Sequence, residues 1–259
     1  MKTNVLGVQI EQAGKNRVLK NIQSSLDRGE QIFIVTPYSE SIVSCQTDEW
    51  YRRTLNSSDI AVADGIGVVW AAHYLNTERT IIASLSAILF NPKSLYRPIP
   101  EKIPGSELVW DLAKQAAQRG ESIYLLGGFG DTAKKTAQVL KAKYPNLIVA
   151  GTHAGAPGDQ DLVGRINESG ADYLFACFGP KTQERWLAEN RQKLKAKLLI
   201  GLGGTFDYLA GKRLKTPGFL RLRGFEWLWR LITQPWRALR VTRGVLGLIY
   251  YSYKAKHRL

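Results

Sequence analysis

The stretch SIYLLGGFGDTAKKTAQVLKAKYPNLIVAGT, residues 122–152, predicts a strand, a helix and a second strand in direct succession. Two short apolar runs, SIYLLGG and LIVAGT, enclose the helix-forming segment DTAKKTAQVLKAKY. Five further apolar runs are each followed by a plausible helix or helical turn: VLGVQI (5–10), QIFIVT (31–36), DIAVAD (59–64), DYLFACF (172–178) and KLLIGLGG (197–204). This alternation predicts an α/β fold with a mostly parallel sheet and helices on both of its faces.

The C-terminal segment 212–259 differs from the rest of the chain in charge. It contains twelve Lys or Arg residues and a single acid, Glu226, and so carries most of the formal net charge of +14. The remaining 211 residues hold 24 basic and 21 acidic residues. At 259 residues the chain is long enough for one domain with a substantial core and an appendage. We therefore expect an α/β domain over 1–211 and a basic, amphipathic helical appendage over 212–259.

Tryptophan and arginine are interleaved in this appendage. In RLRGFEWLWRLITQPWRALR, residues 221–240, three tryptophans lie among five arginines. This composition suits the boundary between anionic headgroups and acyl chains, so an anionic membrane surface is the favoured partner. Core packing and nucleic-acid binding are the alternatives, and net charge alone does not separate the partners. Pro235 is expected to break or kink the helix.

The sequence predicts a protein that lies on the membrane without crossing it. A spanning helix needs about 20 largely apolar residues, and arginines at positions 230, 237, 240 and 243 interrupt every candidate in the tail. The N-terminal stretch MKTNVLGVQIEQAG reaches Glu11 before a signal-peptide core can form. We therefore expect a cytoplasmic protein, peripheral on the inner face of the plasma membrane, with no nucleic acid as a partner.

Polar or glycine-rich segments follow three of the predicted strands. Residues 36–40 follow IFIV, residues 64–67 follow IAVA, and Gly127-Gly128-Phe129-Gly130 follows IYLL. In parallel α/β sheets, ligands bind beyond the carboxyl ends of the strands. Asp64 has two interpretations here: the N-cap of the next helix, or a general base held at the mouth of the sheet. The local sequence does not decide between them.

The glycine cluster has the form of a phosphate-binding motif. Gly128-x-Gly130-x-x-Ala133 follows a strand and opens a helix, as the dinucleotide fingerprint does, and it makes the predicted sheet Rossmann-like. Such glycines let backbone amides approach a diphosphate. A dinucleotide site also needs an acid about 20 residues further on, and the next strand, LIVAGTHAG, contains none. The motif therefore predicts binding of a diphosphate or nucleotide sugar, with tight helix packing as the alternative.

The sequence predicts no metal site. Asp159-Gln160-Asp161 has the spacing of the Asp-x-Asp pair that many sugar-nucleotide enzymes use. The pair stands at a predicted helix start, where acids interact favourably with the helix dipole, and no His or third carboxylate keeps ligand spacing with it. We expect neither a metal nor another cofactor.

Seven motifs, taken together, resemble the WecG/TagA/CpsF glycosyltransferase family, also called glycosyltransferase family 26. They occur in family order from about residue 30 to residue 240: IVTPYSE, VADGIGVVWAA, IPGSEL, YLLGGFGDTA, ADYLFACFGPKTQERWL, IGLGGTFDYLAG and GFEWLWRL. The resemblance implies an inverting, metal-independent transfer of a sugar, typically of the N-acetylmannosamine type, from a UDP-sugar donor. It also implies a lipid-diphosphate-linked sugar as acceptor, in the well-studied branch undecaprenyl-diphosphate-N-acetylglucosamine, and a product used in wall or surface polymer synthesis.

The resemblance also implies residue roles. Asp64 would deprotonate the acceptor hydroxyl, and Thr36 would position substrate beside it. Gln183 and Glu184 would contact the nucleotide sugar.

Arginines of the tail are further candidates. Without a metal, backbone amides and basic side chains must stabilise the charge on the departing UDP. The resemblance implies that the appendage closes over the site, so Arg221, Arg223 and Arg230 are candidates for this role. Contact with lipid headgroups is the alternative role for each of these arginines.

The sequence is also compatible with a homo-oligomer.

The chain departs from the family pattern at four places. Tyr38 replaces the usual Asn, Lys102 the usual Arg, Glu107 the usual Asp, and Lys215-Thr216-Pro217 the usual Arg-Ala-Pro. Lys102 remains a candidate substrate-binding residue, although it offers a point charge where arginine grips a phosphate with a planar fork. These changes leave the donor sugar undetermined. They also leave an alternative function, in which the chain is a catalytically altered nucleotide- or polyanion-binding protein of the same fold. The intact Asp64 and Gln183 favour the enzyme.

An apparent insertion occupies residues 79–99. Its apolar residues have helical spacing and are flanked by Arg79, Lys93 and Arg97, which predicts an amphipathic helix. A second membrane contact or a groove for the acceptor lipid is one interpretation, and a core helix is the other.

Overall fold

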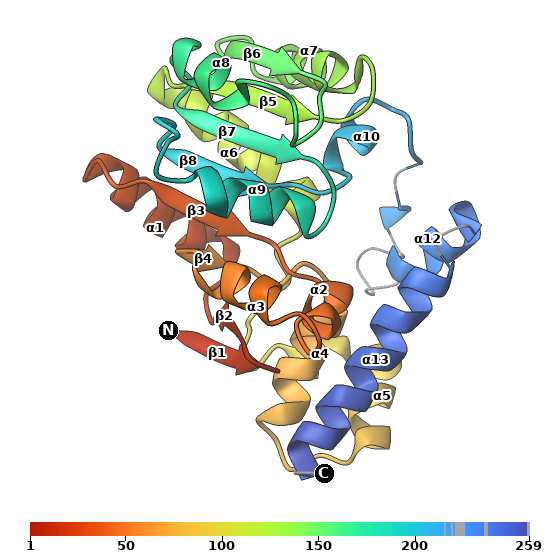
Figure 1. Cartoon of the computed structure of the whole chain (residues 1–259). Helices are drawn as coiled ribbons and strands as arrows, with labels where there is room; N and C mark the ends of the chain where they lie inside the picture. Colours follow the sequence, from red (N-terminus) through yellow and green to blue (C-terminus); the bar gives the residue numbers. More distant parts are fainter. Residues whose placement is uncertain (215, 219, 221–225, 236–237, 258–259) are drawn as a thin grey trace.

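A parallel sheet forms the centre of the molecule. The computed structural model of the chain describes residues 1–214, 216–218, 220, 226–235 and 238–257 (Figure 1). Within these residues, a six-stranded sheet has only parallel neighbours. From edge to edge its strands are β4 (Ile60–Ala61), β3 (Ile32–Val35), β8 (Leu198–Gly201), β7 (Tyr173–Cys177), β5 (Ser122–Gly127) and β6 (Ile148–His153). The predicted α/β fold is confirmed.

Two hydrophobic cores lie on opposite faces of the sheet, because successive residues of a strand point in opposite directions. In β3, Phe33 and Val35 pack in one core, and Ile32 and Ile34 pack in the other. The helices on the Ile32 side are α1 (Lys15–Asp27), α6 (Gly105–Arg119), α7 (Thr132–Lys143) and α10 (Thr205–Leu209). The helices on the Phe33 side are α2 (Ser39–Ser44), α3 (Glu49–Asn56), α4 (Ile66–Leu75), α8 (Leu162–Glu168) and α9 (Thr182–Asn190).

The prediction of a sheet strand over residues 5–10 was wrong. These residues belong to a separate hairpin, in which β1 (Lys2–Val5) pairs antiparallel with β2 (Val8–Glu11). Leu6 and Gly7 form its turn with φ values of 51° and 88°, the left-handed conformation of a two-residue hairpin turn. A glycine between two short apolar runs is a turn signal that the single-strand interpretation overlooked.

The helix α4 has no polar face. Its sequence is IGVVWAAHYL, and eight of its ten residues are buried, including Trp70. A helix that is apolar on all sides has to be covered on all sides. Its neighbours are β1, α2, α5 (Ile81–Phe90) and α13 (Ala238–His257), and Figure 1 shows these helices gathered away from the β5–β6 edge of the sheet.

The C-terminal helix α13 packs closely on α2 and α4. At Gly247 a Cβ atom would lie 2.8 Å from Val43 Cγ1, and at Gly244 it would lie 3.3 Å from the backbone nitrogen of Glu40. The two glycines therefore allow the helix backbones to approach. Leu248, on the same helix, is 2 % exposed and belongs to the core on the α4 side of the sheet.

A lysine fastens the other end of α13. Lys256 Nζ donates to the carbonyl oxygens of Tyr74 at 3.1 Å and of Arg79 at 2.8 Å. These carbonyls lie at and just beyond the end of α4, where a helix leaves acceptors without partners. The last residues of the chain therefore stabilise the end of α4.

The tail contains two described helices, α12 (Glu226–Thr233) and α13. Pro235 lies between them, which confirms the predicted break. In the part of the chain that the structure describes, no helix has the length and apolar character needed to span a membrane.

Replacing Gly247 with leucine tests the packing of α13 on α2. Leucine favours a helix over glycine by roughly 1 kcal/mol, so helix propensity alone predicts a more stable protein. The added side chain would collide with Val43, and such overpacking typically costs about 1–3 kcal/mol. We expect Gly247→Leu to lower the free energy of unfolding in urea, whereas Ala255→Leu, at an exposed position of α13, should not. A G247L protein more stable than the wild type, as helix propensity alone predicts, would contradict this packing.

Candidate active site

The ends of several neighbouring strands supply the site. Thr36 follows β3, Asp64 lies just after β4, and residues 202–205 follow β8. Gln183 lies in the first turn of α9, which follows β7. Because these strands are parallel, their carboxyl ends lie along one edge of the sheet. The structure thus brings Thr36, Asp64, Gln183 and Glu184 together around one cavity.

Backbone contacts hold Asp64 at the entrance to α4. Its N–H donates to the carbonyl of Pro37 at 3.0 Å, which ties the end of β4 to the end of β3. Gly65 has a φ of 119°, a conformation that favours glycine, and is itself the N-cap of α4. The N-cap interpretation of Asp64 therefore does not hold. Asp64 instead lines two adjoining cavities.

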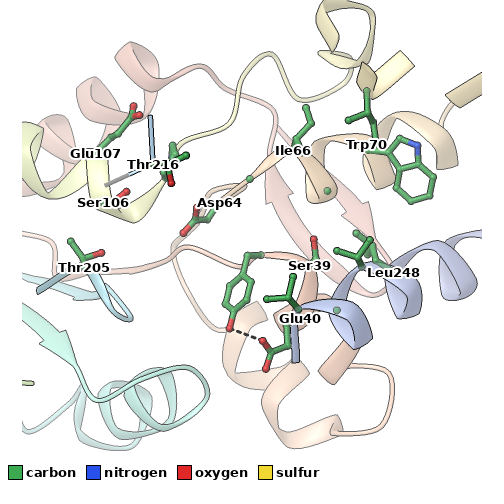
Figure 2. A pocket seen from close by; sticks show the side chains of 18 of the residues that line it. Ser39, Glu40, Asp64, Ile66, Trp70, Ser106, Glu107, Thr205, Thr216 and Leu248 are labelled. Carbon is green, nitrogen blue, oxygen red and sulfur yellow. Dashed lines mark hydrogen bonds between the residues drawn. The ribbon is translucent and has the colours of Figure 1, made fainter. Parts of the chain in front are cut away.

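The large cavity has a volume of about 480 Å³ and extends from Asp64 between α4, α5 and α13. Polar residues line it near Asp64: Ser106, Glu107, Thr205 and Thr216. The side chains that the three helices contribute are apolar: Ile66, Trp70, Leu85, Ile88, Leu89, Val241, Val245, Leu248 and Ile249. Figure 2 shows Asp64 between these four polar residues and the apolar residues Ile66, Trp70 and Leu248. Other lining residues include Tyr38, Ser39 and Glu40, in and just before α2.

The small cavity is polar and has a volume of about 70 Å³. It shares Tyr38, Asp64, Ser106, Thr205 and Tyr208 with the large cavity, and its other walls include Thr36, Gln183, Glu184 and Arg213. Whole small-molecule sites usually occupy about 300–1,000 Å³. The small cavity therefore fits part of a ligand, such as a sugar or a phosphate group.

Gln183 and Glu184 form a buried polar pair in the wall of the small cavity. Gln183 Oε1 accepts from the Gly203 N–H at 2.9 Å, and Gln183 Nε2 donates to Glu184 Oε1 at 2.8 Å. Glu184 Oε2 is buried and has no hydrogen-bond partner among the described residues. Removal from water raises the pKa of Glu184 to about 7. A carboxyl group that titrates near neutral pH therefore stands in the same cavity wall as Asp64.

Arg213 adds a cation to this cavity. Its Nη2 pairs with Asp207 Oδ2 at 2.6 Å, while Nη1 is buried without a hydrogen-bond partner in the part of the chain that the structure describes. Gly204 makes room for the guanidinium, since a Cβ atom there would lie 2.8 Å from Nη1. A guanidinium nitrogen in this position can donate to an anionic group of a ligand.

Tyr38, one of the departures from the family pattern, connects α13 to the cavity wall. Arg240 donates from Nη2 to Tyr38 Oη at 2.5 Å and from Nε to Glu40 Oε1 at 2.6 Å. The Tyr38 hydroxyl donates to Glu40 at 3.2 Å, the dashed line in Figure 2. Burial, reinforced by the Glu40 carboxylate, raises the pKa of Tyr38, so the hydroxyl keeps the proton that it donates. The tail helix is thereby fastened at the rim of the large cavity.

Several predicted site residues lie elsewhere. Among the described residues, the walls of the two cavities do not include Lys102, Gly127, Gly128 or Gly130. The glycines have φ values of 96°, 80° and 59°, and a Cβ atom at Gly127 would lie 2.7 Å from the Cys177 carbonyl oxygen. Close passage of two backbone segments therefore explains Gly127 without a ligand.

The tail arginines are only partly covered by the structure. Arg221 and Arg223 lie outside the described residues, and of Arg230 the structure describes only its place in α12.

Sequence reasoning missed other residues that line the cavities. Thr205 directly follows the KLLIGLGG run, so the rule that selected Asp64, a polar residue after a strand, would also have found it. Arg240 and Glu40 are 200 positions apart, and no local pattern in the sequence pairs them.

Comparison with known proteins identifies the family. The sequence profile of the Glycosyl transferase WecG/TagA/CpsF family matches residues 3–92 and 86–259, and the chain belongs to this family of glycosyltransferases. The two matched segments overlap within the apparent insertion. The chain is 26 % identical over 261 residues to the N-acetylglucosaminyldiphosphoundecaprenol N-acetyl-beta-D-mannosaminyltransferases of Staphylococcus aureus strains MRSA252 and NCTC 8325. Each alignment covers 100 % of this chain and 94 % of the relative.

Glu184 should make the stability of the protein depend on pH. Its pKa is raised in the folded state, so the folded protein holds this proton more tightly than the unfolded chain does. The resulting stabilisation is complete below the ordinary glutamate pKa and is lost as the pH rises through about 7. The free energy of unfolding should fall by up to about 3 kcal/mol across this window.

Urea denaturation at a series of pH values measures this effect. The Glu184→Gln variant should lose that part of the pH dependence, because glutamine has no proton to release. Glu189→Gln, at an exposed position of the same helix, should keep it. Identical pH profiles for the wild type and E184Q would show that Glu184 does not titrate in this range.

Proposed function

We propose that the protein transfers a sugar of the N-acetylmannosamine type from a UDP-linked donor to a saccharide carried on a polyprenyl diphosphate. The observation that carries this proposal is the position of Asp64, which lines both the small polar cavity and the large cavity with its apolar part. A sugar or phosphate of the donor suits the first cavity. An acceptor that combines a sugar, a diphosphate and a hydrocarbon chain suits the second.

In this proposal Asp64 is the general base. Its carboxylate takes the proton of the acceptor hydroxyl while the hydroxyl oxygen forms a bond to the anomeric carbon of the donor. The bond from that carbon to the UDP oxygen breaks on the opposite face. UDP leaves with the bonding electrons, so the configuration at the carbon is inverted. Thr36 and Gln183 hold the reacting part of the donor in the small cavity.

The departing diphosphate gains negative charge that the site has to stabilise. Arg213 is the described residue best placed for this, since its Nη1 has no partner among the described residues and it lines the small cavity. Arg221, Arg223 and Arg230 remain candidates through the family resemblance.

We propose that no metal takes part. The Asp159-x-Asp161 pair does not line the two cavities, and Asp159 accepts from the Ala156 N–H at 3.0 Å and contacts His153. Charge on the leaving group is then compensated by the arginines and by backbone amides.

The relatives support the choice of substrates. Their name specifies N-acetylglucosaminyldiphosphoundecaprenol as acceptor and an N-acetyl-β-D-mannosaminyl group as the sugar transferred. We carry both over to this chain as a proposal, with UDP as the carrier and a cell-surface polysaccharide or wall polymer as the product. A panel of UDP-sugars tests the donor, because Tyr38 and Lys102 differ from the family pattern.

We further propose that segment 212–259 places the protein on the cytoplasmic face of the membrane, where a polyprenyl acceptor resides. Exposed apolar residues of α13 lie on one face of the helix: Leu239, Leu246, Tyr250 and Tyr253. Exposed basic residues, Arg243 and Lys254, lie beside this stripe. The combination suits an anionic membrane surface rather than nucleic acid.

Replacing Asp64 with asparagine tests the proposed base. Asparagine keeps the shape of the side chain but cannot accept the proton, so Asp64→Asn should lower kcat by at least about 100-fold while the urea denaturation midpoint stays close to that of the wild type. Asp159→Asn, and addition of a chelator, should leave turnover near normal. Near-normal turnover of D64N would refute the assignment, and loss of activity with chelator would refute metal independence.

Replacing Leu246 with glutamate tests the membrane contact. Full burial of a leucine side chain contributes about 1.5–3 kcal/mol, and the glutamate adds repulsion from anionic lipid. Leu246→Glu should therefore weaken binding to phosphatidylglycerol vesicles by about tenfold or more. Val139→Glu, an exposed apolar position on α7, is the control and should bind vesicles almost as the wild type does. Equal binding by both variants would show that α13 is not the membrane contact.

A further inference from the structure

We propose that the apolar part of the large cavity, between α4, α5 and α13, binds the first isoprene units of the acceptor's polyprenyl chain. This inference rests on the proposed function and adds to it a site for the lipid.

The chemistry of the walls favours a hydrocarbon. Polar residues line the cavity near Asp64, but every side chain that α4, α5 and α13 contribute to the lining is apolar. The nearby carboxylate of Glu40 is paired with Arg240, at 2.6 Å, and with the Tyr38 hydroxyl. Ser39 also lines the cavity, beside Leu248 (Figure 2). A wall that is mostly apolar gains by burying hydrocarbon. The cavity volume of about 480 Å³ falls in the range of small-molecule sites.

The order of chemical groups along the acceptor matches the order along the cavity. Asp64 and the polar residues stand at one end, where the reacting sugar hydroxyl has to be. The hydrocarbon chain is the part of the acceptor furthest from that hydroxyl. It therefore falls on the walls formed by Trp70, Leu85, Ile88 and Leu248.

The cavity also has an apolar exit. Leu89 lines the cavity and is at the same time 57 % exposed. Its neighbour Phe90, at the end of α5, is 84 % exposed. A long chain that enters the cavity needs such an opening, because most of a polyprenyl chain has to remain in the bilayer. The helix α5 lies in the apparent insertion, and its residues Ser84 and Ala87 are buried while Leu89 and Phe90 are not.

Photolabelling tests the occupant directly. The probe is N-acetylglucosaminyl-diphospho-farnesol that carries a diazirine on its chain, added to the full-length protein in detergent micelles. After irradiation, mass spectrometry should locate labels on α5 and α13, and unlabelled farnesyl diphosphate should compete for them. Labels that lie elsewhere would overturn the inference. So would labels that phosphatidylglycerol removes and farnesyl diphosphate does not, since these would assign the cavity to a membrane phospholipid.

Variants that fill the cavity provide the second arm. Ile88→Trp should reduce cavity labelling and kcat/KM for a polyprenyl acceptor by at least about tenfold, while transfer to an acceptor with a methyl group in place of the chain is unchanged. Leu89→Trp, at the partly exposed rim, should also reduce cavity labelling and kcat/KM for the polyprenyl acceptor. It replaces I88W in the test if I88W fails to fold. Ala83→Trp, at an exposed position of α5 outside the cavity, is the matched control and should behave as the wild type.

The outcomes separate the lipid site from the proposed function. Labelling of α5 and α13 without any sugar transfer would support the lipid site and refute the transferase. Transfer that I88W and L89W leave unchanged on the polyprenyl acceptor would refute the lipid site and support the transferase.

Discussion

The burial of α4 is the constraint on which the rest of the structure depends. A helix with the sequence IGVVWAAHYL cannot expose any side to water without a cost in hydrophobic free energy. It shares one core with Phe33 and Val35 of the sheet, and β1 of the hairpin, α2, α5 and α13 pack around it. Asp64 and Gly65 form the entrance to this helix. The same requirement that buries α4 therefore positions the proposed base and brings the last helix of the chain beside it.

This arrangement connects the tail to the chemistry. Arg240 contacts Tyr38 and Glu40 at the cavity rim, and Lys256 binds carbonyls at the far end of α4. Between these two anchors, α13 forms one wall of the large cavity and carries an exposed apolar stripe on its surface. One helix thus borders the cavity proposed for the acceptor and presents the surface proposed for the membrane. In this account, a lipid-linked acceptor reaches Asp64 along the helix that contacts the bilayer.

Much of the fold follows from patterns in the sequence, because strands that alternate with helices have few ways to form a parallel sheet. The rule that ligands lie beyond strand ends also located Thr36 and Asp64. The hairpin was mistaken for one strand because residues 5–10 are mostly apolar and only Gly7 marks the turn. The loop at Gly127 resembles a phosphate loop, although the approach of the Cys177 carbonyl alone requires glycine there. The interaction of Arg240 with Glu40 depends on the tertiary packing of α13, which single-sequence patterns do not contain.

In the proposed mechanism, Asp64 stands where a donor in the small cavity meets an acceptor in the large one. An experimental structure of the protein with a non-hydrolysable UDP-sugar and a short-chain diphosphate-linked acceptor tests it most directly. We expect an acceptor hydroxyl within hydrogen-bond distance of the Asp64 carboxylate, about 2.6–3.2 Å. The donor sugar should lie beside Thr36 and Gln183, and the hydrocarbon between α4, α5 and α13. Substrates bound with Asp64 remote from the acceptor hydroxyl would contradict it.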